Sequence, residues 1–385
     1  MSAVRPLPRV AIFHHRPIDD PHHGSSIMFR SACEALARHV RVTVVAPSLQ
    51  PHDPEGPSWG SQVRMAGLRY LLRSHWDTLR FVLADVRRRR TERYRVLIAF
   101  DIYLAGATAI WARIRRDHFV YYLLDSNREV AAGWERVGAR GASLYRWLRA
   151  PLDRIALSSA ELVIAPSESV RDGLRQSLAN TPVRVCRPVR TAAPPDARDV
   201  DRWRARLGLE GKLGAVFVGS FQYPPNVRAF EYVRDSLAPR LAESCPEVRL
   251  VVAGRGSETA GRIVAPNVVV AGTVADLDPL LYACSIGLAP MEVSGGTSLK
   301  IVDYLLHGLV TVSTPQAMSG VDASPMIRSA PLTEFPERVQ EVVRELLNQP
   351  RNAARPAPDP KWVRSYTDSS ELEKMAETVA VWEAT

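Results

Sequence analysis

Residues 289–314 read APMEVSGGTSLKIVDYLLHGLVTVST, and this stretch decides the fold class. A short apolar run ends at Pro290, a pair of glycines follows, and residues 297–307 are predicted to form a helix. Gly308 stands where a helix commonly ends in a left-handed residue, and residues 309–314 form a second β-branched run. A strand, a helix and a further strand joined so tightly indicate a parallel βαβ unit.

The same alternation continues in both directions along the chain. Several runs lack the apolar–polar alternation of a half-exposed strand, as expected for a sheet that helices cover on both faces. A proline-rich stretch, residues 183–201, separates the two halves and is predicted to be a linker. The predicted strands are residues 9–14, 41–47, 96–101, 119–125 and 162–167 in the first half, and 214–219, 248–254, 267–272, 286–290 and 309–314 in the second.

The chain is therefore predicted to be an α/β protein with two doubly wound Rossmann-like domains that face a central cleft. The predicted domains are residues 1–188 and 189–360, and residues 361–385 are predicted to form a C-terminal helix that returns to the N-terminal domain. Sheets of this type bind ligands beyond the carboxyl ends of their strands, and a cleft between domains is the default place for an active site.

The composition is that of a folded protein, with 385 residues, 46% hydrophobic and 24% charged. No apolar run is long enough to span a bilayer, and no apolar signal core follows the N-terminus. Four scattered cysteines fit a reducing compartment better than a disulfide framework or a zinc site. The protein is therefore expected to be cytoplasmic.

The net charge is +9, and the basic residues are densest at Arg87, Arg88, Arg89 and Arg90. These arginines close a helix-like stretch, so a solvated basic face beside the negative helix end is the first interpretation. Peripheral contact with anionic lipid at the inner face of the membrane is the second. Nucleic acid is not an expected partner, because no aromatic residues interleave with the basic ones.

Small residues follow almost every strand predicted in the second half. A glycine lets the backbone approach a ligand without an intervening side chain, although tight turns between strands and helices also favour it. Four such sets on one edge of a sheet favour a ligand site over turn formation alone. The sets are Gly219-Ser220, Gly254-Arg255-Gly256, Gly272-Thr273 and Gly295-Gly296-Thr297.

The last of these sets, Gly295-Gly296-Thr297, makes the sharpest prediction. It places free N–H groups at a helix N-terminus, which attracts phosphate, and Lys300 adds a positive charge one turn later. Asp303 is placed either to accept both hydroxyls of a ribose or to lie solvated on the helix, and the sequence leaves both open. A dinucleotide fingerprint at Gly254-Arg255-Gly256 is rejected, because its glycine spacing is wrong.

Three stretches of the second half resemble the GT-B fold glycosyltransferases of the retaining group 1 family, family four. Val218-Gly219-Ser220 with Tyr223-Pro224-Pro225-Asn226 is similar to the family's first-strand turn. Gly272-Thr273-Val274 is similar to its base-binding turn, and residues 289–314 to its signature helix with the flanking strands. The resemblance spans residues 214–320 and implies that a sugar nucleotide binds to residues 190–360.

The resemblance also implies roles for single residues. It assigns the first turn to the phosphates or the transferred sugar, the signature helix to the diphosphate, Thr273 and Val274 to the base, and Asp303 to the ribose. Gly295 stands where many members have a glutamate that contacts the transferred sugar, and Lys300 and Arg255 are expected to replace a missing Arg–Lys pair. The predicted donor-binding residues are Gly219, Ser220, Arg255, Thr273, Val274, Gly295, Gly296, Thr297, Lys300 and Asp303.

In the first half the resemblance rests mainly on the alternation and on Ala165-Pro166-Ser167-Glu168-Ser169. The segment that begins at Gly24 is similar to the family's glycine-rich loop, and Gly24, Ser25 and His15 are predicted to bind the acceptor. Asp101 and Asp125 end two strands and are, with Lys300, the catalytic candidates. The histidines near His15 are interpreted as a mobile polar loop and not as a metal site, because adjacent pairs point apart.

The sequence therefore predicts a metal-independent glycosyltransferase, similar to hexosyltransferases, that moves a sugar from a UDP- or GDP-linked donor to an acceptor hydroxyl. The resemblance implies retention of the anomeric configuration, and no cofactor is expected. The N-terminal domain would bind the acceptor, which is left open among a saccharide, a lipid-linked saccharide and a small natural product. Two alternatives stay open, a nucleotide-sugar epimerase on the same fold and a non-catalytic module that binds nucleotide sugars.

Overall fold

The computed structural model describes most of the chain. These residues divide into two compact units, which we call unit 1 (Met1–Val189 and Asp368–Thr385) and unit 2 (Arg190–Thr367). Unit 2 is thus inserted into unit 1, and the chain returns to unit 1 at Asp368. The described residues are 9–14, 24–45, 94–100, 102–124, 142–175, 178, 181–190, 192–221, 223–259, 265–293, 297–350 and 355–384.

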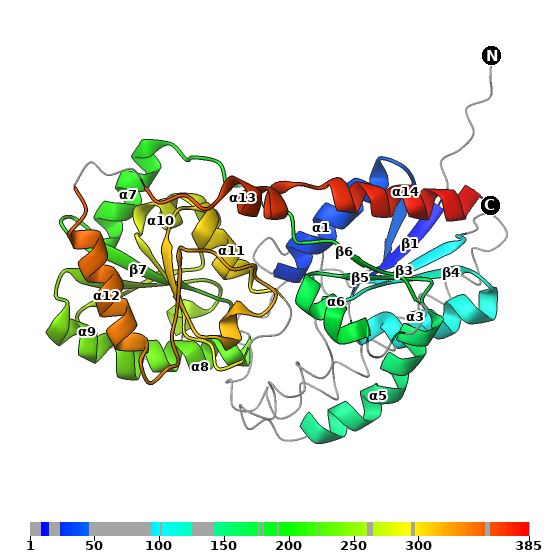
Figure 1. The fold of residues 1–385 in the computed structure, drawn as a ribbon, viewed down its shortest axis with the longest axis horizontal. Helices are drawn as coiled ribbons and strands as arrows, with labels where there is room; N and C mark the ends of the chain where they lie inside the picture. The colour runs from blue at the N-terminus through cyan, green and yellow to red at the C-terminus, as the bar shows by residue number, and fades with distance from the viewer. Residues whose placement is uncertain are drawn as a thin grey trace, which may run out of the picture. The chain divides into compact units, whose positions relative to one another are not determined.

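Unit 1 is built on a six-stranded parallel sheet with the order β2-β1-β3-β4-β5-β6. Helices α1 and α14 contact each other on one side of this sheet, and α3 and α5 pack together on the other (Figure 1). Its elements are β1 Arg9–Phe13, α1 Gly24–Ala37, β2 Arg41–Val45, β3 Val96–Phe100, α3 Ile102–Arg115, β4 His118–Tyr122, α5 Ala142–Ser159, β5 Leu162–Ala165, α6 Glu168–Arg175, β6 Val183–Val185 and α14 Ser370–Ala384.

Unit 2 has a second six-stranded parallel sheet with the order β12-β11-β10-β7-β8-β9. Its strands are β7 Leu213–Val218, β8 Val248–Ala253, β9 Val268–Gly272, β10 Ile286–Ala289, β11 Val310–Ser313 and β12 Ile327–Ser329. Its helices are α7 Ala197–Leu207, α8 Pro224–Tyr232, α9 Ala238–Ser244, α10 Asp278–Ala283, α11 Leu299–Leu306, α12 Phe335–Leu347 and α13 Pro360–Thr367, with a π-turn at Val233–Leu237 and 3-10 turns at Ser257–Thr259 and Gln316–Met318.

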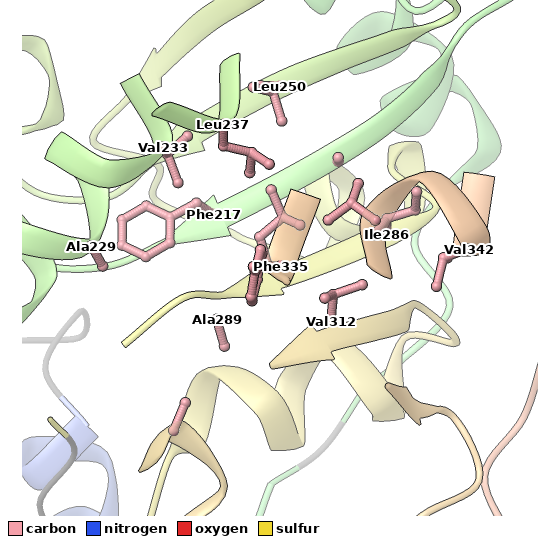
Figure 2. Close-up of a cluster of buried hydrophobic side chains, with 14 of the residues drawn as sticks. Phe217, Ala229, Val233, Leu237, Leu250, Ile286, Ala289, Val312, Phe335 and Val342 are labelled. Carbon is pink, nitrogen blue, oxygen red and sulfur yellow. The ribbon is translucent and has the colours of Figure 1, made fainter. Parts of the chain in front are cut away.

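Both faces of the unit 2 sheet are covered by apolar side chains. Figure 2 shows one cluster, in which Phe217 packs with residues of α8, α9 and α12 such as Phe335. On the other face Leu207, Leu280 and Tyr304 bring α7, α10 and α11 together. Burial on both faces explains why these strands are continuous apolar runs.

The strand order of unit 2 reverses at its first strand, β7. The chain builds outward from β7 through β8 to β9, and then returns to the opposite side of β7 for β10, β11 and β12. Such a reversal separates the connections at the carboxyl ends of the two central strands and leaves a crevice for a ligand. The turns that follow β7 and β10 therefore form the candidate site.

The prediction of two doubly wound Rossmann-like sheets is confirmed. The prediction of a linker over residues 183–201 is wrong in part. Val183–Val185 pairs with β5 as a sixth strand, and α7 begins at Ala197. The described part of the chain holds no helix that is both long and apolar enough to cross a membrane.

Candidate functional site

Backbone hydrogen bonds tie the three turns that follow β7, β8 and β9 together at one edge of the sheet. The N–H of Gly219 donates to Ala253 O at 3.0 Å, and the N–H of Phe221 donates to Arg255 O at 2.9 Å. The N–H of Gly254 donates to Gly272 O at 2.9 Å. The structure thus brings together Gly219, Ser220 and Arg255, which the sequence predicted as neighbours at one ligand site.

Gly254 is required for this arrangement. Its φ is +124°, and a Cβ at this position would lie 2.1 Å from Gly219 O. A side chain there would push the turn after β8 away from the turn after β7, because the obstacle is backbone and cannot rotate away.

Asn226 bridges the two sides of the strand reversal. Its Nδ2 donates to Ser220 O at 2.9 Å, in the turn after β7, and its Oδ1 accepts from Lys300 Nζ at 2.7 Å, on α11. The amide occupies the space that a Cβ on Gly219 would need, since that Cβ would lie 2.8 Å from Asn226 Cγ. Asn226 therefore holds Lys300 beside Gly219 and Ser220.

Lys300 is a half-buried cation with neutral surroundings. Its Nζ lies 3.4 Å from Met291 Sδ and 4.7 Å from the centre of the Phe217 ring, and no carboxylate among the described residues pairs with it. Burial lowers the pKa of Lys300 from its ordinary value to about 7. An anionic ligand at this position would supply the negative charge that the described protein residues do not.

Thr297 precedes α11 and adds a second polar group. Its Oγ1 is buried, and no described residue forms a hydrogen bond with it. Gly295 and Gly296, which the sequence assigned to the same diphosphate, lie outside the described residues. Binding of a diphosphate by Thr297 and Lys300 stays a prediction.

Asp303 faces Arg190, the first residue of unit 2. Arg190 Nε and Nη2 donate to the two carboxylate oxygens at 2.6 Å and 2.8 Å, so the pair is bidentate. The carbonyl of Asp303 also contacts His307 Nδ1 at 2.7 Å, and His307 Nε2 contacts Asp278 Oδ1 at 2.9 Å. Each carboxylate oxygen of Asp303 keeps a second lone pair, so ribose binding there stays a prediction that is compatible with this geometry.

Replacing Asp303 with Ala should destabilise the protein by about 2 kcal/mol. Removing one partner of a buried ion pair costs about 3–5 kcal/mol, and this pair is slightly exposed, at 19% for Arg190 and 14% for Asp303. Urea unfolding of the purified variant measures the difference. Asp199→Ala is the control, because its pair with Arg202 is exposed and should change the free energy of unfolding by less than about 1 kcal/mol. Equal destabilisation by the two variants would contradict a stabilising role of the ion pair between Asp303 and Arg190.

The remaining predicted donor residues lie after β9. Thr273 Oγ1 donates to Glu258 Oε1 at 3.3 Å, which links the turns after β8 and β9, and Val274 is buried. Their assignment to the base stays a prediction.

The predicted catalytic and acceptor residues of the first half are mostly not placed. Asp101, Asp125 and His15, like Arg87 to Arg90, lie outside the described residues. Gly24 and Ser25 open α1, and their side chains are not among those described. His14, at the end of β1, is buried and stacks on Phe29 with ring centres 4.6 Å apart.

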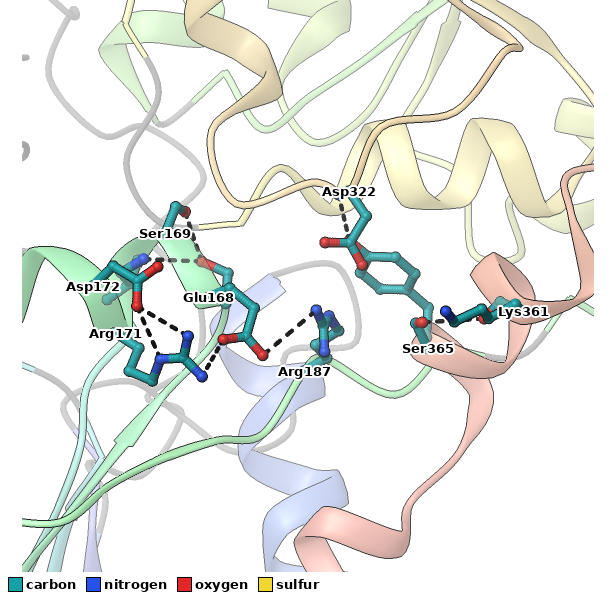
Figure 3. A network of polar contacts seen from close by, with 11 residues as sticks. Glu168, Ser169, Arg171, Asp172, Arg187, Asp322, Lys361 and Ser365 are labelled. Atoms are coloured by element: carbon teal, nitrogen blue, oxygen red, sulfur yellow. Dashed lines mark hydrogen bonds and ion pairs between the residues drawn. The ribbon is translucent and has the colours of Figure 1, made fainter.

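A polar network follows β5 in unit 1 (Figure 3). Glu168 pairs with Arg171 and lies 4.0 Å from Arg187, and Ser167 Oγ accepts from the N–H of Val170 at 3.3 Å. This stretch is the one that resembles the family's last N-domain turn, and the contacts show it as a helix start fixed by side chains. In the described residues, no three His, Cys, Asp or Glu side chains group in a way that suits a metal ion.

Sequence reasoning missed Asn226 and Arg190 as parts of this site. Asn226 belonged to the stretch that carried the resemblance, but its bridge to Lys300 joins residues 74 positions apart in the chain. Arg190 sits in the predicted linker and meets a residue 113 positions away. Pairings at such separations leave no local pattern in a single sequence.

Two families of domains match the chain. The family described as glycosyl transferase 4-like domain matches residues 23–189, and glycosyl transferases group 1 matches residues 212–348. A comparison with curated proteins finds no match.

Solved structures with the same fold include several glycosyltransferases. Sucrose-phosphate synthase from Thermosynechococcus elongatus has a TM-score of 0.64 at 14% identity, over 98% of this chain and 96% of that one. Anabaena Alr3699/HepE, in complex with UDP and glucose, has a TM-score of 0.58 at 15% identity, over 98% and 97%. WaaG, a glycosyltransferase involved in lipopolysaccharide biosynthesis, has a TM-score of 0.57 at 15% identity, over 96% and 98%.

Proposed function

Because the chain belongs to the group 1 glycosyltransferases, as the domain matches over both of its halves show, we propose that it transfers a sugar from a nucleotide-diphosphate donor to an acceptor hydroxyl. Residues 189–360 bind the donor in this proposal, residues 1–188 bind the acceptor, and residues 361–385 return to the N-terminal domain. We propose a UDP-linked donor first, since Alr3699/HepE has been solved with UDP-glucose. A GDP-linked donor is the alternative.

The observation that carries the proposal is the position of Lys300. A cation that no described carboxylate neutralises lies at the strand reversal, where sheets of this type bind ligands, and in the first turn of α11. Thr297 Oγ1 and the N–H groups that open α11 are further donors in the same region. A diphosphate is a ligand that would use all of these groups.

In the proposed reaction, the bond between the anomeric carbon and the diphosphate oxygen breaks and a bond to the acceptor oxygen forms. The electron pair of the broken bond stays on the diphosphate, and the departing diphosphate oxygen accepts the proton of the acceptor hydroxyl. Lys300 and the helix N–H groups stabilise the charge that develops on the leaving group, without a metal or another cofactor. Asp101 or Asp125 orients the acceptor hydroxyl, the transferred group is a hexose, and the anomeric configuration is retained.

Binding of a sugar nucleotide should take up close to one proton at pH 8. Lys300 with a pKa of about 7 is mostly neutral there, and a bound diphosphate raises its pKa and restores the charge. Affinity should therefore fall by up to about tenfold per pH unit above pH 7 and stay flat below it. Calorimetry of UDP-glucose binding in buffers with different ionisation enthalpies measures the uptake, because both of its phosphates are esterified and do not titrate there. No proton uptake by the native protein, or the same uptake by Lys300→Met, would contradict this assignment.

The proposed function is tested by binding and turnover together. Thermal shift with UDP, GDP and their sugar conjugates should raise the melting temperature, with about 2.7 kcal/mol of stabilisation at 100 times the dissociation constant. Turnover is then followed as release of the nucleoside diphosphate with saccharide, lipid-linked and small-molecule acceptors. Sugar isomerisation without an acceptor would indicate the epimerase, binding without any turnover would indicate the non-catalytic module, and no nucleotide binding would refute the proposal.

We propose further that the enzyme works in the cytoplasm and contacts the anionic inner face of the membrane through Arg87, Arg88, Arg89 and Arg90. The basis is the density of positive charge in this segment of the sequence. Sedimentation with phosphatidylglycerol vesicles should exceed that with neutral vesicles and fall with added salt. Equal sedimentation with both lipids would contradict this contact.

A further inference from the structure

The two central strands of unit 2 stop pairing before their carboxyl ends. β7 and β10 pair only at Ala215 with Ile286 and Val216 with Gly287, whereas β7 and β8 pair over all six residues of β7. Carried forward, this register would place Leu288 opposite Phe217 and Ala289 opposite Val218. Those pairs do not form. The two strands therefore separate before their carboxyl ends, and the crevice at the strand reversal begins between β7 and β10.

The hydroxyl of Tyr304 stands between the two strands at this point. The N–H of Val218 donates to Tyr304 Oη at 2.7 Å, and the hydroxyl donates to Leu288 O at 3.4 Å. A backbone donor on β7 and a backbone acceptor on β10 are thus satisfied through a side chain instead of through each other.

The surroundings fit a tyrosine closely. Tyr304 is fully buried, and its ring covers Gly287, where a Cβ would lie 2.4 Å from Tyr304 Cδ2. Burial also raises the pKa of Tyr304 well above its ordinary value, so the hydroxyl keeps the proton that it donates to Leu288. The room for the ring therefore depends on a glycine in β10.

We propose that Tyr304 is a positioning residue that holds β7 and β10 apart at their carboxyl ends and so sets the width of the nucleotide-sugar site. The inference rests on the proposed function. Val218 leads directly into Gly219 and Ser220, and β10 leads into Met291, which contacts Lys300. Tyr304 is also one helical turn from Lys300 on α11. The separation of the strands thus sets the distance between the first-strand turn and the cation, without contact between Tyr304 and the ligand.

Tyr304→Phe tests the proposal in the full-length protein. Without the hydroxyl, the N–H of Val218 and the C=O of Leu288 lose their shared partner, and they can pair with each other if the strands approach, which narrows the site. The Kd of UDP and the KM of the donor should each rise at least about tenfold, since displacements near 1 Å can cost this much or more. Gly287→Ala keeps the hydroxyl but displaces the ring, and it should weaken UDP binding in the same direction.

Tyr232→Phe is the matched control. Tyr232 Oη donates to Leu332 O at 2.8 Å from α8, so this variant also loses one hydroxyl-to-carbonyl hydrogen bond in unit 2. It should lower the melting temperature by less than Tyr304→Phe does, because only one hydrogen bond is lost, and it should leave the Kd of UDP within twofold of the native value. If the native protein and Tyr304→Phe bind UDP equally, the positioning role is refuted while the proposed function stands. If the native protein binds no nucleotide, both are refuted.

Discussion

Lys300→Met is expected to lower the kcat of the proposed sugar transfer by about 100- to 1000-fold, the effect of losing one preorganised donor to a developing negative charge. The Kd of UDP rises by about 10- to 100-fold, since a hydrogen bond to a charged group contributes about 1.5–3 kcal/mol. The native contact with Asn226 Oδ1 at 2.7 Å is replaced by a thioether of similar length that carries no charge. Steady-state kinetics and calorimetry with the donor measure the two effects.

The loss of activity in Lys300→Met should occur without unfolding. Two measurements, of stability and of a control variant, distinguish a defect in the site from unfolding. The folded pKa of Lys300, about 7, lies below its unfolded value, so its charge opposes folding below about pH 10 and most strongly at pH 7 and below. The Met variant should therefore be at least as stable as the native protein at pH 7. Lys361→Met removes an exposed lysine from the same unit and should change neither kcat nor Kd. Native-like kinetics for Lys300→Met would remove the main support for the donor site.

Gly254→Ala is expected to destabilise unit 2 by about 4 kcal/mol. A non-glycine residue at positive φ costs about 1–3 kcal/mol, and forcing a methyl group into occupied space costs about 1–3 kcal/mol more. Here the Cβ would lie 2.1 Å from Gly219 O, so the turn after β7 must move together with the turn after β8. Urea unfolding should show the loss, and the remaining folded protein should bind UDP more weakly.

Gly211→Ala is the control in which no steric contact is made. Gly211 also has a positive φ, +67°, but a Cβ there would meet nothing within 4 Å. This variant should lose only about 1 kcal/mol, the cost of the backbone conformation. Equal destabilisation by the two variants would show that the contact between the turns after β7 and β8 carries no energy of its own.

The sheets could be predicted from the sequence because they depend on local patterns. Apolar runs such as Val96–Phe100 and Ile286–Ala289 are buried strands, and the glycine after α11 ends that helix as expected. The helical stretch from α8 to α9 is interrupted by the π-turn at Val233–Leu237. Pro239 explains the interruption, because it has no N–H and its ring crowds the carbonyl four residues earlier. β6 was missed because three residues at a sheet edge carry almost no pattern.

The candidate site could be predicted only in part. The turns at Gly219, Gly254 and Gly272 follow from the rule that parallel strands end on one edge, and Lys300 follows from its place in the signature helix. Asn226 and Tyr304 act through hydrogen bonds between distant elements, which a single sequence does not encode locally. Asp303 was predicted without its bidentate partner Arg190 for the same reason.

The insertion of unit 2 into unit 1 has a consequence for biosynthesis. As the chain leaves the ribosome, β1 to β6 appear first, the whole of unit 2 follows, and α14 comes after both. Glu373 on α14 pairs with Arg38 and His39 near the end of α1, so the nascent unit 1 lacks this covering helix while unit 2 is being made. Unit 2 can complete its own fold during translation, whereas the N-terminal sheet lacks α14 until the end of synthesis, so the surface that α14 covers is the part that chaperones would have to protect.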